Sequence, residues 1–133
     1  MYDRWAQERR RKNADPVYVQ MLEENRAVHR LAMAYQKDLG LVGRIIRIDG
    51  KIKAYTFGYP LNIEIFCDLF EIADLKIKGL PTFAFREFCW DAEAAQYKFI
   101  NVMDDFALPN VERTKLSFKP VAMLPVYTIT KMV

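Results

Sequence analysis

The sequence predicts an α+β (α/β) domain with a mixed, mostly antiparallel central sheet and helices on both of its faces. Three observations lead to this prediction. Apolar residues recur at helical spacing in the first forty residues, Asp49-Gly50 separates two β-rich runs, and strand-like and helix-like segments alternate in the second half. A hairpin starts a sheet antiparallel, whereas the later alternation adds helices to its faces.

Two helices are expected at the start. The segment Tyr2–Lys12 carries Trp5 but few other apolar anchors, so it needs a neighbour to pack against. A second helix starts at Asp15-Pro16, because Asp caps free N–H groups and Pro suits the first helical position, and Gly40 supplies a left-handed stop. Its apolar stripe is expected to consist of Met21, Val28, Leu31 and Tyr35, and its wet face of Glu23, Glu24, Arg26, Arg30 and Lys37.

Three strands follow. The runs Leu41–Ile48 and Ile52–Gly58 are joined by Asp49-Gly50, a pair suited to a hairpin turn in which both residues take positive φ. After a break at Pro60, the run Ile63–Ile72 is dense in Ile, Phe and Leu, as expected of a strand buried on both faces.

The second half is predicted to alternate between helices and strands. The expected elements are a helix Thr82–Ala92, a strand Tyr97–Val102, a helix Leu108–Phe118 and a closing strand Val121–Thr130. No internal repeat or low-complexity linker is present. We therefore expect a linker helix over residues 1–14 and one domain over 15–133.

Composition indicates one globular domain without a membrane span. The chain has 133 residues, of which 52% are hydrophobic and 28% charged. Its formal charge of +3 is too small to indicate nucleic-acid binding, and the basic run Arg9–Lys12 is either a solvated helix face or a polyanion contact. No segment approaches the roughly 20 apolar residues of a membrane span, and no secretion signal is evident, so we expect a cytoplasmic location.

The cysteines indicate a reduced protein. Cys67 and Cys89 are far apart and form no paired-cysteine motif, so two structural thiols and no metal site are predicted. Cys89 as a nucleophile would need a base, and the only histidine is His29.

Several phrases resemble one family. The segment Asn101–Pro120 is similar to a line of the form N-x-x-x-D-x-G-x-x-x-L-R-x-x-K-x-S-[YF]-x-P, although Ala107 stands where Gly is usual and Glu112 where Arg is frequent. The positions that agree are Asn101, Asp105, Lys115, Ser117, Phe118 and Pro120. Further phrases that resemble the family are Gly43–Gly58, Glu71–Asp74, Gly79 and Arg86–Phe88.

Together these phrases resemble the C-terminal domain of phosphatidylglycerol lysyltransferase-like proteins, which have the acyltransferase fold of the GCN5-related N-acetyltransferase superfamily. The resemblance covers about residues 14–131. It implies a tandem of two such domains, of which this chain is long enough for the second. The lysyltransferases of this family move an amino acid from aminoacyl-tRNA to a lipid head group, so the resemblance implies aminoacyl-tRNA or acyl-CoA as donor and leaves the acceptor open.

Two hypotheses follow about function and partners. In the first, the chain is an acyl- or aminoacyltransferase domain that works with a homologous N-terminal domain. In the second, it is a non-catalytic interaction module that has kept the fold and lost the site. An isolated half would expose the surface meant for its partner, so self-association is also expected. A third, weaker option is nucleic-acid binding, including tRNA, through Arg9–Lys12, Lys76 and Lys78.

A phosphate-binding loop is one candidate site. Superfamily members bind the acyl-CoA pyrophosphate with a loop [QR]-x-x-G-x-[GA], and the corresponding residues here run from Lys76 to Pro81. Gly79 matches, Lys76 replaces Gln or Arg, and Pro81 removes one N–H from the nest. Lys76 and Gly79 are therefore cofactor-binding candidates, and the alternative is that Gly79-Leu80-Pro81 only starts a helix.

Three residues are catalytic candidates. Glu71 lies where superfamily members often place an acid–base carboxylate, and burial would raise its pKa into a useful range; alternatively it pairs with Lys76 or an arginine. Asp105 either caps the following helix or pairs with the amino group of an aminoacyl donor. Tyr127 either donates a proton to the leaving group or packs in the core.

Lys115 is a third cofactor-binding candidate, after Lys76 and Gly79. It lies three residues after Glu112 on the same helix face, so it either forms a surface pair with that residue or contacts the phosphate of tRNA, CoA or lipid.

Overall fold

Two compact units make up the protein, Met1–Asn101 and Val102–Val133, and each is described by itself. The computed structural model describes residues 1–91, 93–105, 107–127 and 129–131. The first unit contains a four-stranded sheet with three helices, and the second contains one helix.

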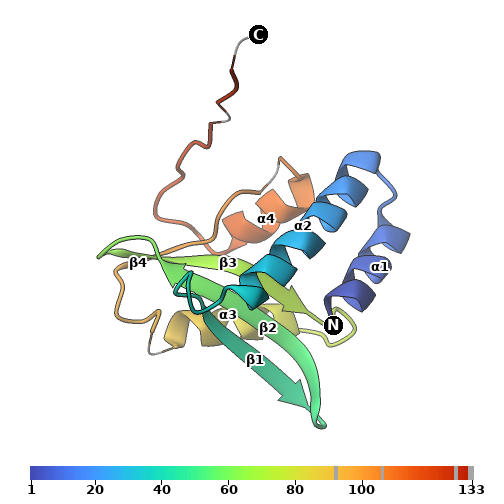
Figure 1. The fold of residues 1–133 in the computed structure, drawn as a ribbon, viewed down its shortest axis with the longest axis horizontal. Helices are drawn as coiled ribbons and strands as arrows, with labels where there is room; N and C mark the ends of the chain where they lie inside the picture. Colours follow the sequence, from blue (N-terminus) through green and yellow to red (C-terminus); the bar gives the residue numbers. More distant parts are fainter. Residues whose placement is uncertain (92, 106, 128, 132–133) are drawn as a thin grey trace. The chain divides into compact units, whose positions relative to one another are not determined.

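The sheet of the first unit is mixed and mostly antiparallel, which confirms the predicted fold class (Figure 1). Its spatial order is β1-β2-β3-β4. The first two neighbouring pairs are antiparallel, whereas β3 and β4 run parallel over three residue pairs. The strands span Val42–Ile48 (β1), Lys51–Pro60 (β2), Ile65–Ala73 (β3) and Phe99–Asn101 (β4).

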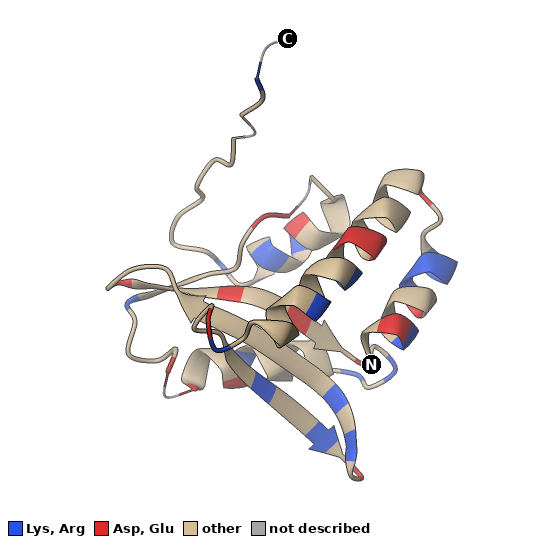
Figure 2. Ribbon diagram, in the orientation of Figure 1, with Lys and Arg blue, Asp and Glu red and all other residues tan. Residues whose placement is uncertain are grey.

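The turn between β1 and β2 forms as the sequence predicts. Ile48 pairs with Lys51, which leaves Asp49 and Gly50 as the two turn residues. Their φ angles are 50° and 73°, the left-handed values that this two-residue turn requires. Lys and Arg residues lie along both strands of this hairpin (Figure 2).

Helices cover both faces of the sheet. On one face, α1 (Tyr2–Lys12) packs with α2 (Pro16–Ala34), and His29 of α2 stacks on Phe70 of β3. On the other face, α3 (Leu80–Trp90) covers β2 and β3. The core beneath α3 contains two clusters, Ala54, Ala73, Leu80 and Ala84, and Phe66, Phe88 and Ala94.

The predicted start of α2 is correct, whereas its predicted core face is wrong. Asp15 accepts hydrogen bonds from the amides of Val17 and Tyr18, at 2.8 and 3.1 Å. Val28, Leu31 and Tyr35 are 45%, 57% and 53% exposed. The helix instead buries a neighbouring stripe that includes its one histidine: Tyr18, Leu22, His29 and Ala32. It also ends at Ala34, and Gly40 forms a later turn with φ 61°.

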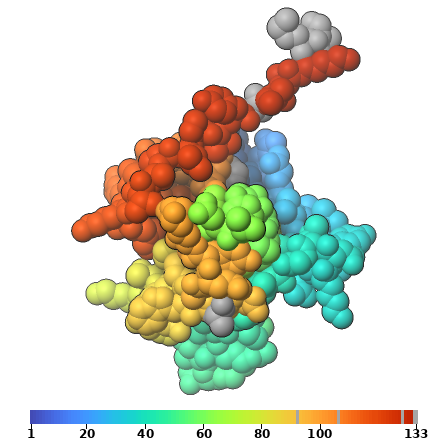
Figure 3. All heavy atoms as spheres, turned by 90° about the vertical axis from the view of Figure 1, so that its left-hand side faces the viewer, coloured from blue at the N-terminus to red at the C-terminus, as the bar shows by residue number. Residues whose placement is uncertain are grey.

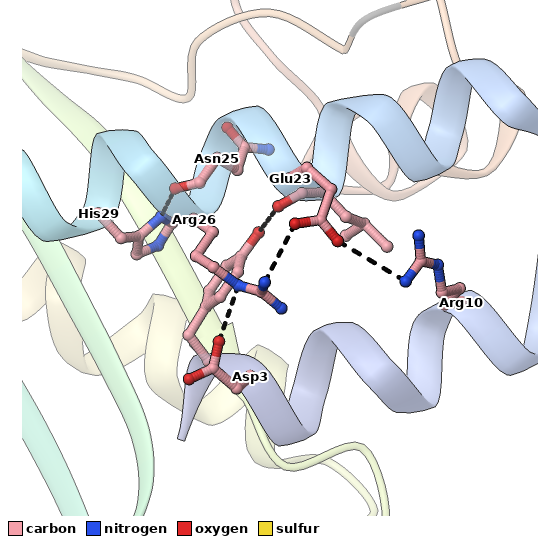
Figure 4. Close-up of polar contacts among 8 residues, drawn as sticks. Asp3, Arg10, Glu23, Asn25, Arg26 and His29 are labelled. Carbon is pink, nitrogen blue, oxygen red and sulfur yellow. Dashed lines mark hydrogen bonds and ion pairs between the residues drawn. The ribbon is translucent and has the colours of Figure 1, made fainter.

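Ion pairs and one aromatic anchor attach α1 to α2. The Arg26 guanidinium pairs with Asp3 at 2.8 Å and Glu23 at 3.0 Å, and Arg10 reaches Glu23 at 3.7 Å (Figure 4). The Tyr2 hydroxyl donates to the Leu22 carbonyl at 2.7 Å. The neighbour that this short polar helix needs is therefore α2.

In the second unit, α4 (Pro109–Ser117) forms near its predicted position, but the predicted closing strand is wrong. The described residues of Val121–Thr130 have no regular structure, and their apolar side chains are exposed along an extended run, red in Figure 3. A strand requires a ladder partner, and the described part of this unit contains no other strand.

Two other predicted elements change their bounds. The strand expected at Tyr97–Val102 is reduced to β4, and the helix expected from Thr82 already starts at Leu80 as α3. Ala92, the predicted end of that helix, lies outside the described residues.

Candidate functional site

Glu71 lies near the end of β3, on the face that α3 covers. It pairs in register with Thr56 of β2, two residues from the pair formed by Ala54 and Ala73. These two alanines pack against α3, and alternate strand residues share a face, so Glu71 also faces α3. Lys76, one of the partners that the alternative interpretation gave to Glu71, forms an ion pair with Glu8 at 2.9 Å.

A β-bulge brings Asp68 to the same face. Residues three apart in a regular strand face opposite sides of the sheet. Here Phe57 pairs with Phe70 and Gly58 with Asp68, so β3 contains one extra residue between Asp68 and Phe70. The bulge shifts the alternation by one, which places Asp68 and Glu71 on one side, as bulges often do near functional sites.

Burial makes Glu71 a carboxyl group that can exchange a proton near neutral pH. Loss of solvation, with a smaller contribution from the charge of Asp68, raises the pKa of Glu71 to about 8. A carboxyl in this range can act as a general acid or a general base at physiological pH.

The two thiols are unsuited to nucleophilic chemistry. Burial, together with the charges of Asp68 and Glu71, raises the pKa of Cys89 to about 11, and burial also raises that of Cys67. His29 lies on the opposite face of the sheet from Cys89, where it stacks on Phe70. The thiols therefore stay protonated, without this histidine as a base.

A hollow of about 380 Å³ opens between the β1–β2 hairpin and α3. Thr56, the register partner of Glu71, is among its lining residues. Arg44 and Asp91 form a two-pronged ion pair beside it, with N–O distances of 2.5 and 2.9 Å. The sequence analysis did not identify this hollow, because its walls come from separate elements. The remaining lining residues are Ile45, Ile46, Tyr55, Phe83, Ala84, Glu87, Phe88 and Trp90.

The start of α3 leaves little room for a phosphate nest. Gly79 is the N-cap residue in a left-handed conformation, with φ 81°. The Leu80 amide donates to the Ile77 carbonyl at 3.2 Å, Pro81 has no N–H, and the Phe83 amide donates to Gly79 at 2.9 Å. Of the first four residues of α3, only residue 82 has an N–H group that takes no part in these hydrogen bonds.

In the second unit, Lys115 binds backbone carbonyls. Its ammonium donates to the carbonyl groups of Val102, Met103 and Asp104, the last two at 3.0 and 2.5 Å. The Lys115 side chain therefore ties α4 to the segment that precedes it.

Asp105 and Ala107 form a tight turn in the same segment. The Asp105 carboxylate accepts the Ala107 amide at 2.8 Å, and Leu108, without a side-chain cap, is the N-cap residue of α4. Ala107 has φ 52°, a conformation that favours glycine, and it stands where the family line has Gly. Asp105 therefore stabilises a turn in which alanine is strained.

The predicted site residues are divided between the units. Glu71, Lys76 and Gly79 belong to the first unit, whereas Asp105 and Lys115 come together in the second. Tyr127 also belongs to the second unit and is 79% exposed, outside any regular element. Among the described residues, no group of three or more His, Cys, Asp or Glu side chains is placed to hold a metal ion.

These features define a mixed α+β domain with a half-buried carboxyl of raised pKa on its third strand. The chain belongs to the family described as phosphatidylglycerol lysyltransferase, C-terminal, whose model matches residues 1–130.

One solved structure is similar, a conserved protein of unknown function from Bacteroides thetaiotaomicron VPI-5482. The two share 30% identity over 92% of this chain, with a TM-score of 0.64. The match spans 43% of the length of that protein. No curated protein matches the chain. Over the described residues, every helix is too short or too polar to cross a bilayer.

Proposed function

We propose that this chain is the C-terminal, acyltransferase-like domain of an aminoacyltransferase, in which Glu71 exchanges the proton of the reaction. The family name describes lysyl transfer to phosphatidylglycerol. The observation that carries the proposal is the Glu71 carboxyl, with a pKa of about 8, on the face of β3 that α3 covers.

In the proposed reaction, a hydroxyl of the acceptor attacks the ester carbonyl of the aminoacyl donor. The Glu71 carboxylate takes the hydroxyl proton as the new C–O bond forms. The tetrahedral intermediate then breaks the ester bond to the ribose, and Glu71 returns the proton to the departing ribose oxygen. A well-placed acid–base group contributes typically ~10²–10⁴-fold to such a step.

The start of α3 favours aminoacyl-tRNA over acyl-CoA as the donor. A CoA pyrophosphate needs several convergent N–H groups, whereas the helix start here has bonded or lost most of them. The ester of an aminoacyl-tRNA has no pyrophosphate next to the reacting carbonyl. Lys76 and Gly79 therefore form part of the loop before α3 and bind no CoA pyrophosphate in this proposal. A contact between Lys76 and a phosphate of the tRNA would compete with the ion pair between Lys76 and Glu8.

The partial pairing of β3 supports access to Glu71. β4 pairs with Ile65–Cys67 only, so β3 continues to Ala73 beyond that partner. From Leu69 to Ala73, this edge of β3 lies beyond the β4 ladder and pairs with no second strand among the described residues. An extended donor can form hydrogen bonds there beside Glu71.

The second unit carries candidate residues of its own. Asp105 can pair with the ammonium of an aminoacyl group, and the Tyr127 hydroxyl can donate a hydrogen bond to a bound substrate. Lys115 shapes the segment that carries Asp105, since its ammonium already binds three carbonyls. A homologous N-terminal domain completes the cleft, and a supply of aminoacyl-tRNA requires a cytoplasmic site of action.

The test is transfer of radiolabelled lysine from lysyl-tRNA to phosphatidylglycerol vesicles by the natural full-length protein that carries this chain. Glu71→Gln is expected to lower kcat/KM by about 100-fold or more. The matched control is Glu24→Gln, an exposed position on α2 that accepts a hydrogen bond from Gln20 at 2.8 Å. Equal rates for Glu71→Gln and the wild type would exclude Glu71 as the proton-exchanging group.

A non-catalytic module is the second candidate. The bonded start of α3 and the bonded Lys115 ammonium favour it, because both features remove phosphate contacts. Binding of lysyl-tRNA and of acyl-CoA to the full-length protein discriminates between the two functions. Absence of both, together with absence of transfer, supports the module.

A further inference from the structure

His29 lies in an aromatic cage between α1, α2 and the sheet. It is 3% exposed. Its ring stacks on Phe70 of β3 at 3.9 Å between centroids, contacts Tyr2 of α1 at 4.5 Å and meets the edge of Tyr55 of β2 at 5.9 Å. Three elements other than its own helix therefore enclose one imidazole.

The hydrogen bonding of His29 suits the neutral ring. Its Nδ1 donates to the Asn25 carbonyl at 2.7 Å, a contact shown in Figure 4. The other nitrogen, Nε2, is buried and has no hydrogen-bond partner among the described residues. A proton on Nε2 would place a charged donor among aromatic rings, which is costly without an acceptor. Burial accordingly lowers the pKa of His29.

The groups that face this cage offer no compensation for an imidazolium. From α1, Asp3 is paired with Arg26, and from α2 the Arg26 guanidinium adds a positive charge nearby (Figure 4). Burial raises the pKa of Tyr2 to about 12 and also raises that of Tyr55, so both phenols stay neutral. Phe70, the contact from β3, is apolar. Within the described structure, charging His29 is therefore unfavourable while the cage is closed.

Of the elements around the cage, α1 is held least firmly. It buries only Tyr2 and Ala6, and Tyr2 is the residue that covers His29. Its other ties to α2 are ion pairs with largely exposed partners, such as Arg10 with Glu23. Exposed ion pairs contribute little to stability. Opening the cage at α1 costs less than separating β2 from β3.

We propose that α1 is a pH-dependent latch, which the protonation of His29 releases from α2 and the sheet. The proposal is independent of the proposed function. The pKa of His29 is lowered while α1 is docked and returns toward its ordinary value when α1 leaves. Docking is thus complete above that ordinary value and weakens as pH falls through it. Each unit of difference in pKa changes the docking equilibrium by about tenfold.

Hydrogen exchange along the full chain tests this proposal. Amide protection in α1, corrected for intrinsic exchange, is followed between about pH 7.5 and 5 for the wild type, His29→Gln and His29→Phe. The wild type is expected to lose α1 protection at least several-fold over this range, whereas both variants keep a constant value. Protection in α3, on the other face of the sheet, serves as the internal control. Asp3→Asn, which removes the pair with Arg26, is expected to weaken α1 protection at every pH and to keep the pH dependence.

Trp5 of α1 provides a second readout. Its ring lies 5.6 Å from that of Tyr2. With Trp90→Phe as background, the remaining tryptophan emission is expected to change with the same midpoint as α1 exchange. A pH-independent α1 would overturn the latch, as would an equal loss in His29→Gln. Simultaneous loss of protection in α1 and α3 would also overturn it, since that result means global unfolding.

Discussion

Thr56 of β2 lies directly opposite Glu71 of β3, on the face of the sheet that α3 covers. Thr56 is buried and also lines the hollow between the β1–β2 hairpin and α3. The hollow thus reaches a residue adjacent to the carboxyl with the raised pKa. This pair connects an open surface feature to the candidate catalytic group.

Glu71 is expected to make stability fall as pH rises. Its pKa is about 8 in the folded protein and 4.5 ordinarily, so between these values the folded state holds a proton that the unfolded state has lost. The stabilising contribution is complete below 4.5 and is lost as pH rises through about 8. As pH rises from about 5 to 9, the free energy of unfolding of Glu71→Gln should therefore increase relative to that of the wild type. The increase should be on the order of 2 kcal/mol, a value already reduced for the partial exposure of Glu71.

Urea denaturation at a series of pH values measures this gain. Glu24→Gln, at an exposed site, is the control and should follow the wild-type curve. A constant difference between Glu71→Gln and the wild type would show that Glu71 titrates near its ordinary value.

Gly58 is expected to tolerate no side chain. A Cβ at this position would lie 2.5 Å from the Phe66 ring, 2.6 Å from the Cys67 carbonyl oxygen and 2.7 Å from the Phe88 ring. The carbonyl belongs to the paired strand β3 and cannot move without breaking the ladder. Gly58→Ala should cost about 1–3 kcal/mol by overpacking, measured by urea denaturation.

Gly43→Ala is the comparison for Gly58→Ala. The three atoms nearest to an added Cβ at Gly43 all belong to the Phe57 ring, the first at 2.8 Å, and this ring can rotate away. Its cost should be clearly smaller. Equal losses in the two variants would mean that a general effect of glycine replacement, rather than packing at Gly58, decides the result.

The sequence predicted correctly those features that depend only on interactions between residues close together in the chain. Asp49-Gly50 predicted the hairpin turn and Asp15 predicted the start of α2, because both depend on neighbouring backbone groups. The bulge between Asp68 and Phe70 could not be predicted, since it depends on how β3 pairs with β2. Without it, Asp68 and Glu71 would be assigned to opposite faces.

Tertiary packing overruled two patterns. The stripe containing Leu31 and Tyr35 was expected to be buried, but α2 buries His29 and Ala32 instead, and the His29 ring stacks on Phe70 of the sheet. The strand expected at Val121–Thr130 had the right composition and lacked a partner. Composition indicates a preference for extended structure, whereas a ladder requires a second strand.

The Asp15 cap is expected to contribute about 1 kcal/mol. Its Oδ1 accepts two otherwise free amides at the start of α2, those of Val17 and Tyr18. Asp15→Ala should lower the free energy of unfolding by about 0.5–2 kcal/mol in urea titrations. Asp15→Asn keeps the acceptor and should retain most of the stability. If Asp15→Asn lowers the free energy of unfolding as much as Asp15→Ala does, the charge of Asp15 rather than its capping hydrogen bonds stabilises the helix.

Lys115 is expected to order the segment before α4 rather than to contact a phosphate. Its ammonium binds three successive carbonyl groups, and hydrogen bonds from charged donors contribute about 1.5–3 kcal/mol each when formed in a buried setting. At this partly exposed site, Lys115→Met should speed amide exchange at Ala107 and Leu108 by about tenfold, as hydrogen-exchange NMR can resolve. Lys119→Met, at an exposed position after α4, should leave these amides unchanged. Unaltered exchange in Lys115→Met, combined with weaker tRNA binding by the full-length protein, would assign Lys115 to phosphate recognition instead.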